Sequence, residues 1–104
     1  MTKRQICGVS ATMKIIGSKW TVLILHELCG GKKRFGQLQR ALTGISPKTL
    51  AERLKQLEEN DIVSKKVFPE IPLHVEYSLT KKGVSLKTII EQMETWGQKT
   101  VKLT

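Results

Sequence analysis

The chain has 104 residues and carries 18 Lys or Arg residues against nine Asp or Glu residues, which gives a net charge of +9 and a pI near 9.9. This length allows one domain with a modest core, and the basic excess favours polyanionic partners, of which nucleic acid is the commonest. The longest aliphatic run, Val22–Leu25, is far too short to cross a bilayer and no apolar leader follows the polar first residues, so we expect a cytoplasmic protein without a membrane partner.

The positive charge is unevenly distributed along the chain. Residues 1–34 carry seven bases and one acid, residues 35–80 carry six of each, and residues 81–104 carry five bases and two acids. The central segment is therefore neutral. On charge alone, a protein that is basic without binding nucleic acid remains an alternative.

Two helices are predicted in the first third of the chain. Val9–Ile16 forms a short helix that ends near Gly17, and Ser18 suits the N-cap of the next helix. The second helix has a core-facing apolar stripe at helical spacing, made by Trp20, Leu23, Ile24 and Leu28. Gly30-Gly31 ends this helix, because glycine accepts the left-handed conformation found there.

The segment over about residues 35–59 predicts a helix-turn-helix. Apolar residues recur at helical spacing in two runs, Phe35, Leu38 and Leu42 and then Leu50, Leu54 and Leu57. Thr43-Gly44-Ile45 interrupts them, Ser46 suits an N-cap, and Pro47 suits a first helical position. Two helices joined by a short turn with glycine are typical of a motif whose second helix enters the DNA major groove.

A hairpin over about residues 62–79 makes the predicted motif a winged one. Ile62–Phe68 and Leu73–Leu79 are the expected strands, with Pro69–Pro72 as their connection. The expected fold class is therefore mainly α with a small β-hairpin: a winged helix-turn-helix that fills residues 1–104 as a single domain and ends in a long C-terminal dimerisation helix.

This last helix is expected over about residues 81–100, with Thr80 as its N-cap. Its apolar stripe contains Leu86, Ile89, Ile90, Met93 and Trp96. Because the earlier elements already provide a core, we interpret these five residues as the interface of a two-fold homodimer. Such a dimer places two recognition helices about 34 Å apart on a palindromic operator. Packing of the helix against its own domain is the alternative.

Short motifs that extend from Cys7 to Trp96 carry a family resemblance. They are Ile16–Trp20, Leu23–Leu25, Arg34–Leu38, Gly44–Leu50, Leu54–Glu58 and Val75–Thr80, with Gly83 and Trp96 beyond. In this combination the chain resembles the HxlR-type transcriptional regulators, winged-helix proteins related to the MarR group. The resemblance implies a dimeric regulator that often acts close to its own gene, with its terminal helices forming the dimer interface. A repressor is expected rather than an activator.

Three positions depart from the family pattern. Gly8 follows Cys7 where the family commonly has Pro, and Asp61 stands where Gly is usual after the recognition helix. Leu73-His74 replaces an Arg that often follows the second loop proline. This last change weakens the case for a contact between the wing tip and the minor groove.

The candidate DNA contacts lie on the second helix of the motif and on basic residues around it. Lys48, Thr49 and Arg53 are the first candidates for reading bases and Gln56 is the next, since Arg can bond guanine bidentately and Gln adenine. Ser46 offers a phosphate contact at the helix start. Further phosphate contacts are expected from Lys32, Lys33, Arg34, Lys65 and Lys66. For each lysine, a solvated surface position is the alternative.

Cys7 is the candidate for redox sensing. It follows Lys3 and Arg4 and precedes a helix start, and both features stabilise a reactive thiolate. The family resemblance implies the same, because redox-responsive members use a cysteine here. An idle thiol is the alternative for Cys7, and Cys29 is expected to pack in the core.

Enzymatic activity finds no support in the sequence. His26 and His74 have no catalytic or ligand partner at useful spacing, and Asp61 is the only aspartate. No phosphate loop, nucleophile elbow or zinc motif occurs, so we expect no cofactor and no metal. A small-molecule effector is not identified. The alternative to a DNA-binding regulator is a winged-helix module that binds another protein.

Overall fold

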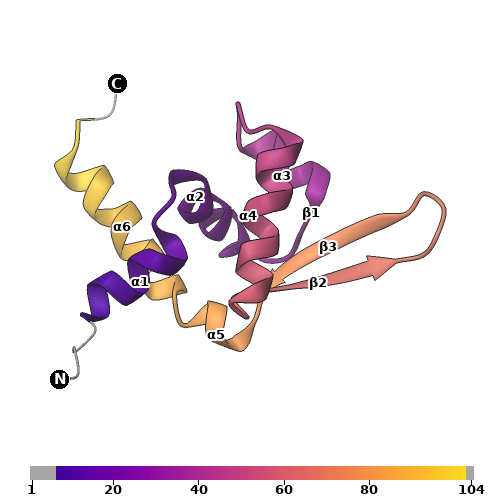
Figure 1. Ribbon diagram of the computed structural model, residues 1–104. Helices are drawn as coiled ribbons and strands as arrows, with labels where there is room; N and C mark the ends of the chain where they lie inside the picture. The colour runs from indigo at the N-terminus through magenta and orange to yellow at the C-terminus, as the bar shows by residue number, and fades with distance from the viewer. Residues whose placement is uncertain (1–6, 103–104) are drawn as a thin grey trace, which may run out of the picture.

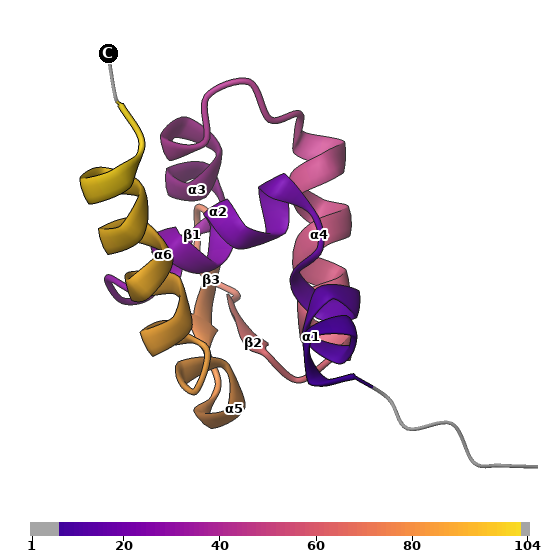
Figure 2. The same ribbon diagram turned by 90° about the vertical axis from the view of Figure 1, so that its left-hand side faces the viewer.

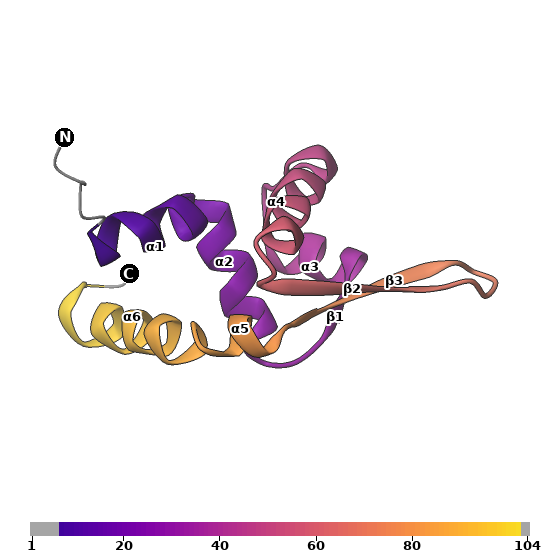
Figure 3. The ribbon, with the colours of Figure 1, turned by 60° about the horizontal axis from the view of Figure 1, so that its bottom comes forward.

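The computed structural model describes residues 7–102. In chain order its elements are α1 (Gly8–Ile16), α2 (Lys19–Leu28), β1 (Lys33–Arg34), α3 (Phe35–Ala41), α4 (Pro47–Glu59), β2 (Val63–Phe68), β3 (His74–Leu79), α5 (Lys81–Val84) and α6 (Lys87–Thr100) (Figure 1). The strands form one antiparallel sheet in the order β1-β3-β2. The β2–β3 hairpin projects from one end of the molecule, and α1 and α6 lie at the other end (Figures 1 and 3). The fold is mainly helical with a winged helix-turn-helix, as predicted.

Helix α2 is the centre of the core. It contacts α1, α3, α4, α6 and strand β3, so that it has neighbours on several sides (Figure 2). The predicted stripe on this helix needs correction, because Ile24 and Leu28 are buried whereas Trp20 and Leu23 are only half-buried. Leu25, which the stripe omitted, is buried. A helix surrounded on several sides buries a wider face than a single stripe.

The helix-turn-helix consists of α3 and α4, where the apolar spacing predicted it. The Ser46 hydroxyl accepts a hydrogen bond from the backbone N–H of Thr49 at 3.0 Å, and Pro47 occupies the first turn of α4. Gly44 in the turn has φ +94°, which favours glycine. Leu50, Leu54 and Leu57 of α4 are all buried in the common core. Local turn and cap chemistry therefore agrees with the tertiary packing here.

Asp61 lies in the turn that follows α4 and has a left-handed backbone conformation, with φ +57°. This is the position where the family usually has glycine, and an aspartate tolerates the conformation better than most side chains do. The carbonyl of Asp61 accepts a hydrogen bond from the Thr80 hydroxyl at 2.6 Å, and the Thr80 backbone N–H donates to the carbonyl of Ile62 at 3.0 Å. These bonds hold the turn against the start of α5.

The sheet contains one strand that the sequence pattern did not predict. In the hairpin, the register runs from Val63 opposite Leu79 to Phe68 opposite His74, and each strand begins one residue later than expected. Strand β1 lies on the other side of β3 and places Arg34 opposite Glu76. A strand of two residues is too short to show a period of two, which is why the sequence did not reveal it.

The predicted long C-terminal helix is present as α6 and ends at Thr100, but it is not continuous from residue 81, because the chain turns at Ser85 and Leu86 between α5 and α6. Thr80 is the N-cap of α5, as predicted, and accepts a bond from the backbone N–H of Gly83 at 3.0 Å. Gly83 is buried against the carbonyl of Ile62, which fixes α5 against the base of the hairpin. The turn changes the direction of the chain between α5 and α6. As a result, α6 packs along α2.

Gly83→Ala is expected to lower the free energy of unfolding by about 1–3 kcal/mol, because the added methyl group would overlap the carbonyl of Ile62, which cannot move freely. Gly97→Ala is the matched control: Gly97 lies within α6 with no atom near the added Cβ, and the change should stabilise by about 0.5–1 kcal/mol. Urea unfolding of both variants measures the difference. Equal unfolding midpoints would contradict the close packing of α5.

Candidate DNA-binding surface

The exposed face of α4 carries the predicted base-reading residues. Lys48 and Gln56 are exposed and Thr49 and Arg53 are half-buried, whereas the leucines of the same helix are buried beneath them. Glu52, Lys55 and Glu59 share the exposed surface of the helix. The polar face of α4 therefore lies opposite its leucines, and Glu52 and Glu59 offset part of the positive charge of Lys48, Arg53 and Lys55.

Arg53 is held in place by Gln56. Its Nη1 donates a hydrogen bond to Oε1 of Gln56 at 3.2 Å, and its Nε is covered and has no partner within the described chain. The guanidinium is therefore oriented before any ligand arrives, which lowers the entropy cost of a bidentate contact. The amide group of Gln56 remains free to donate, so the two side chains form one polar unit on α4.

Ser46 is the N-cap of α4, as predicted, and its hydroxyl is also bonded to the Thr49 side chain. Its hydroxyl donates to Oγ1 of Thr49 at 2.9 Å and accepts from the backbone N–H of the same residue. Because a hydroxyl has one proton, that of Ser46 is already engaged. The Thr49 hydroxyl keeps its own proton free to donate.

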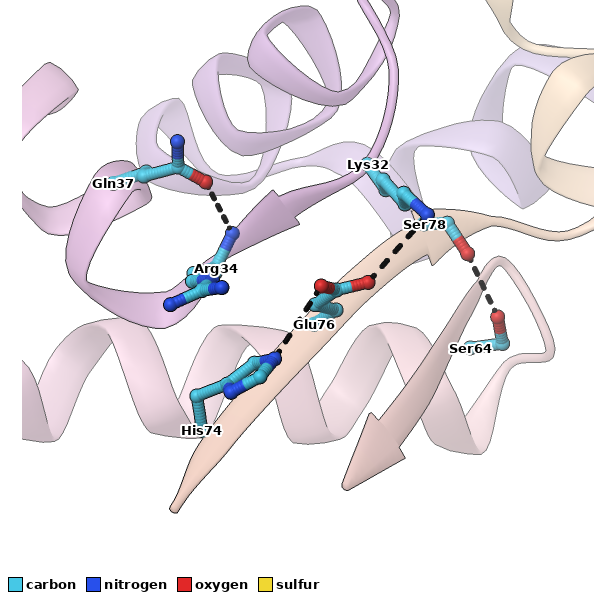
Figure 4. Close-up of polar contacts among 7 residues, drawn as sticks. All are labelled: Lys32, Arg34, Gln37, Ser64, His74, Glu76 and Ser78. Carbon is cyan, nitrogen blue, oxygen red and sulfur yellow. Dashed lines mark hydrogen bonds and ion pairs between the residues drawn. The ribbon is translucent and has the colours of Figure 1, made fainter. Parts of the chain in front are cut away.

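The basic run before α3 is not uniformly exposed, which corrects the prediction. Lys33 is half-buried in β1, opposite the buried Tyr77. Lys32 is exposed, and its Nζ lies 3.8 Å from a carboxylate oxygen of Glu76 on β3 (Figure 4). Arg34 is exposed at the N-cap of α3, where Gln37 accepts a bond from its backbone N–H at 2.8 Å. Among the three residues, only Arg34 combines an exposed cation with the absence of an ion-pair partner in residues 7–102.

The two lysines of the wing point to opposite faces of the sheet, because neighbouring residues on a strand alternate. Lys65 lies opposite Tyr77, which is buried beneath the helices, so Lys65 is on the side of α4. Lys66 lies opposite Glu76 on the other face, with its Nζ 5.0 Å from the centre of the Phe68 ring. The two residues therefore present their charges on opposite faces of the wing.

The outer face of the wing is a connected polar surface that sequence patterns did not predict. His74 Nε2 lies 3.5 Å from the carboxylate of Glu76, and the His74 ring stacks on Phe68 with 4.5 Å between centroids. Ser64 and Ser78 form a hydrogen bond of 3.1 Å across the same two strands (Figure 4). These contacts stiffen the hairpin. The register of β2 against β3 brings these residues together. The sequence predicted the bounds of the strands only approximately and did not predict this register.

The two cysteines have contrasting environments. Cys7 is exposed at the N-cap of α1, and the backbone N–H groups of Ser10 and Val9 lower the pKa of its thiol, although the side chain makes no capping hydrogen bond of ordinary geometry. Cys29 is half-buried against the core at the end of α2, and burial raises the pKa of its thiol. Only Cys7 combines access with a stabilised thiolate.

The five residues of the predicted dimer interface are not all exposed in the structure. Ile90 is buried in the core of its own chain and Leu86 is half-buried against that core, which corrects the expectation that both are free for a partner. Ile89, Met93 and Trp96 are 44%, 48% and 63% exposed. They lie on α6, and an open groove of about 590 Å³ separates Ile89 from Val9 and Met13 of α1, which are also exposed.

Within residues 7–102, no helix is long and apolar enough to span a membrane. In the same range, no three His, Cys, Asp or Glu side chains gather closely enough to hold a metal ion. His26 contacts Glu94 at 3.5 Å, which joins α2 to α6.

The capped helix α4, the preceding α3 and the hairpin define a winged helix-turn-helix protein. The model of the HxlR-like helix-turn-helix family matches residues 15–104. The chain therefore belongs to the HxlR family and is a DNA-binding transcriptional regulator of the HxlR and MarR type.

Related proteins agree with this assignment. The transcriptional regulator YodB of Bacillus subtilis is 42% identical over 89 residues, which cover 86% of this chain and 80% of YodB. Among solved structures, the oxidised form of the redox regulator HypR matches with a TM-score of 0.88 and 36% identity over 93% of this chain and all of HypR. A protein of Porphyromonas gingivalis described as a MarR-family regulator matches with a TM-score of 0.90 and 37% identity, over 97% of this chain and 99% of the other.

Arg53→Ala is expected to cost about 1–3 kcal/mol of binding free energy on a specific duplex and little on random DNA. Arg53 and Gln56 are hydrogen-bonded to each other. The double variant, which combines Arg53→Ala with Gln56→Ala, should therefore lose less binding free energy than the sum of the losses in the two single variants. Fluorescence anisotropy of the four proteins completes this cycle. An equal loss on both duplexes would show that Arg53 contacts only phosphate.

Proposed function

We propose that the chain is a homodimeric repressor that binds a palindromic operator and releases it when Cys7 is oxidised. The observation that carries the DNA-binding part is the orientation of Arg53 by Gln56 on the exposed face of a capped helix. Lys48 and Thr49 stand at the start of the same helix, where recognition helices approach base edges. Repression requires only that the bound protein occupies the operator.

Base contacts and phosphate contacts are divided between α4 and its surroundings. Lys48, Thr49, Arg53 and Gln56 supply the base contacts. Arg34, at the start of α3, and Lys65, on the face of the wing that the helices cover, are exposed cations, and they neutralise flanking phosphates. Lys32 and Lys66 contribute at longer range, because Glu76 partly compensates both charges.

The homodimer forms through the exposed apolar surface of α1 and α6. Val9 and Met13 on α1 and Ile89, Met93 and Trp96 on α6 are between 44% and 71% exposed, and leaving such a continuous apolar surface in water is unfavourable. A second copy of the chain offers the same surface, so a two-fold axis covers both at once. This interface lies at the end of the molecule away from the wing, which leaves both α4 helices free (Figure 1).

Cys7 connects oxidation to this interface. The thiolate attacks one oxygen of a hydroperoxide, the O–O bond breaks, and the products are a sulfenic acid on Cys7 and an alcohol or water. Cys7 directly precedes α1, whose residues Val9 and Met13 belong to the proposed interface. A polar or bulky group there changes how the two subunits meet, and with it the spacing of the two α4 helices. The similarity to HypR and YodB supports this regulation.

Selective binding to duplex from upstream of the protein's own gene is expected, by about a thousandfold over a scrambled duplex. Fluorescence anisotropy across a salt series measures both affinities, and the salt slope counts the neutralised phosphates. Titration well above the dissociation constant should give two chains per duplex. Equal weak binding to both duplexes would favour the protein-interaction module, and one chain per duplex would contradict the homodimer.

Cys7→Ser is expected to abolish the release of DNA by a hydroperoxide, whereas Cys29→Ser should retain it. The lowered pKa of Cys7 means that its thiolate forms at lower pH than an ordinary cysteine thiolate, so alkylation of Cys7 by iodoacetamide should reach its plateau at lower pH than alkylation of Cys29. Mass spectrometry after timed alkylation measures both rates. Full oxidant response in Cys7→Ser would refute the sensor.

A further inference from the structure

An open cavity of about 380 Å³ lies where the start of α3 meets the first half of β3. One side is cationic, with Arg34 and Arg40 of the helix-turn-helix. The other side is apolar, with Phe35 on α3 and Leu73 and Val75 on the wing. The cavity thus joins the two parts of the fold that approach DNA, and it offers charge and apolar surface together.

The two arginines have no carboxylate partner among residues 7–102, where the ion pairs are those of His26 with Glu94 and of Lys32 and His74 with Glu76. Glu76 is the acid beside them on the sheet, and its two oxygens are already approached by Lys32 at 3.8 Å and His74 at 3.5 Å (Figure 4). The cavity therefore carries two guanidinium groups that form no ion pair among residues 7–102, and such a site attracts an anion.

Arg40 reaches this cavity from the last turn of α3 because Gly36 leaves room in the first turn. A Cβ added to Gly36 would stand 3.4 Å from Nη1 of Arg40, so the guanidinium lies directly over the glycine. The bond between the Gln37 side chain and the backbone N–H of Arg34 fixes the start of the helix. Both guanidinium groups are thereby brought to the same cavity from positions six residues apart in the sequence.

The position of the cavity indicates which anion it binds. Val75 points to the same face of β3 as the buried Tyr77, whereas Arg34, which is paired with Glu76, and His74 belong to the opposite face. The cavity therefore lies at the edge of the sheet where α3 begins, and the wing extends beyond α3 and α4 (Figure 3). Because the first helix of a helix-turn-helix crosses the DNA backbone when the second enters the major groove, the anion nearest to this cavity is a backbone phosphate.

We propose that this cavity seats one sugar-phosphate unit of the DNA backbone, with Arg34 and Arg40 on the phosphate and Phe35, Leu73 and Val75 against the deoxyribose. The proposal rests on DNA binding through α4 and adds Arg40 to the contacts. A phosphate accepts hydrogen bonds from the two guanidinium groups, and the C–H groups of the sugar cover the apolar side. A free inorganic anion would leave that apolar side exposed.

The test uses a random-sequence duplex, because a backbone contact does not depend on sequence. Arg40→Gln should lower the slope of log affinity against log salt by about 0.9 and weaken binding by about three- to tenfold near 150 mM salt. Arg40→Lys should keep most of the slope, since it retains the charge. Lys99→Gln is the matched control: Lys99 is an exposed cation on α6, distant from the cavity, and its loss should leave the slope unchanged.

The outcomes separate this proposal from the DNA-binding function on which it rests. Wild-type protein that binds no duplex would overturn both. Normal wild-type binding with an unchanged slope in Arg40→Gln would overturn the backbone seat alone, and so would weaker binding at an unchanged slope, which would indicate a structural role for the arginine.

A second measurement tests the sugar. In NMR titrations of the ¹⁵N-labelled protein, deoxyribose 5-phosphate should shift the Arg34 and Arg40 side-chain signals at lower concentration than inorganic phosphate does. Equal shifts by both would overturn the sugar contact. Binding of deoxyribose 5-phosphate together with an unchanged DNA salt slope in Arg40→Gln would identify a small-anion site instead, and would overturn the proposal.

Discussion

The burial of α4 against α2 is the packing on which the rest of the structure depends. Leu50, Leu54 and Leu57 on one helix and Ile24, Leu25 and Leu28 on the other are almost completely shielded from water. Burial of each such side chain contributes about 1.5–3 kcal/mol, so this contact is a major part of the stability of a chain of this size. It also sets the rotation of α4 about its own axis. The polar face of α4, with Arg53 and Gln56, points outward because the leucine face cannot.

Electrostatic compensation differs between the outer face of the wing and helix α3. On the outer face, Glu76 is approached by Lys32 and His74, and Lys66 lies opposite it on the neighbouring strand. Arg34, at the start of α3, and Arg40, in its last turn, form no ion pair among the described residues. Two unpaired guanidinium groups therefore stand at the meeting of α3 with β3.

The turn between α5 and α6 lets the C-terminal residues make two different sets of contacts. Gly83 lets α5 approach the base of the hairpin, and the chain then turns so that Ile90 enters the core beside α2. Ile89, Met93 and Trp96 lie on the remaining face of α6 and stay exposed. One helix thus stabilises its own chain and leaves an apolar surface exposed. It also connects that surface to α2, and through α2 to α4.

The sequence by itself determined the helix-turn-helix, because Ser46, Pro47, Gly44 and the leucine spacing act within a few residues of one another. The caps at Ser18 and Thr80 and the polar face of α4 were predictable for the same reason. Only the tertiary structure decided which of Leu86, Ile89 and Ile90 would be buried, since their spacing is equally good for a core and for an interface. The tertiary structure likewise decided the pairing of β1 with β3, which joins segments about 40 residues apart. This pairing half-buries Lys33 and brings Arg34 and Arg40 together beside β3. Local patterns cannot encode such pairings, because they arise only when the hairpin packs against α3.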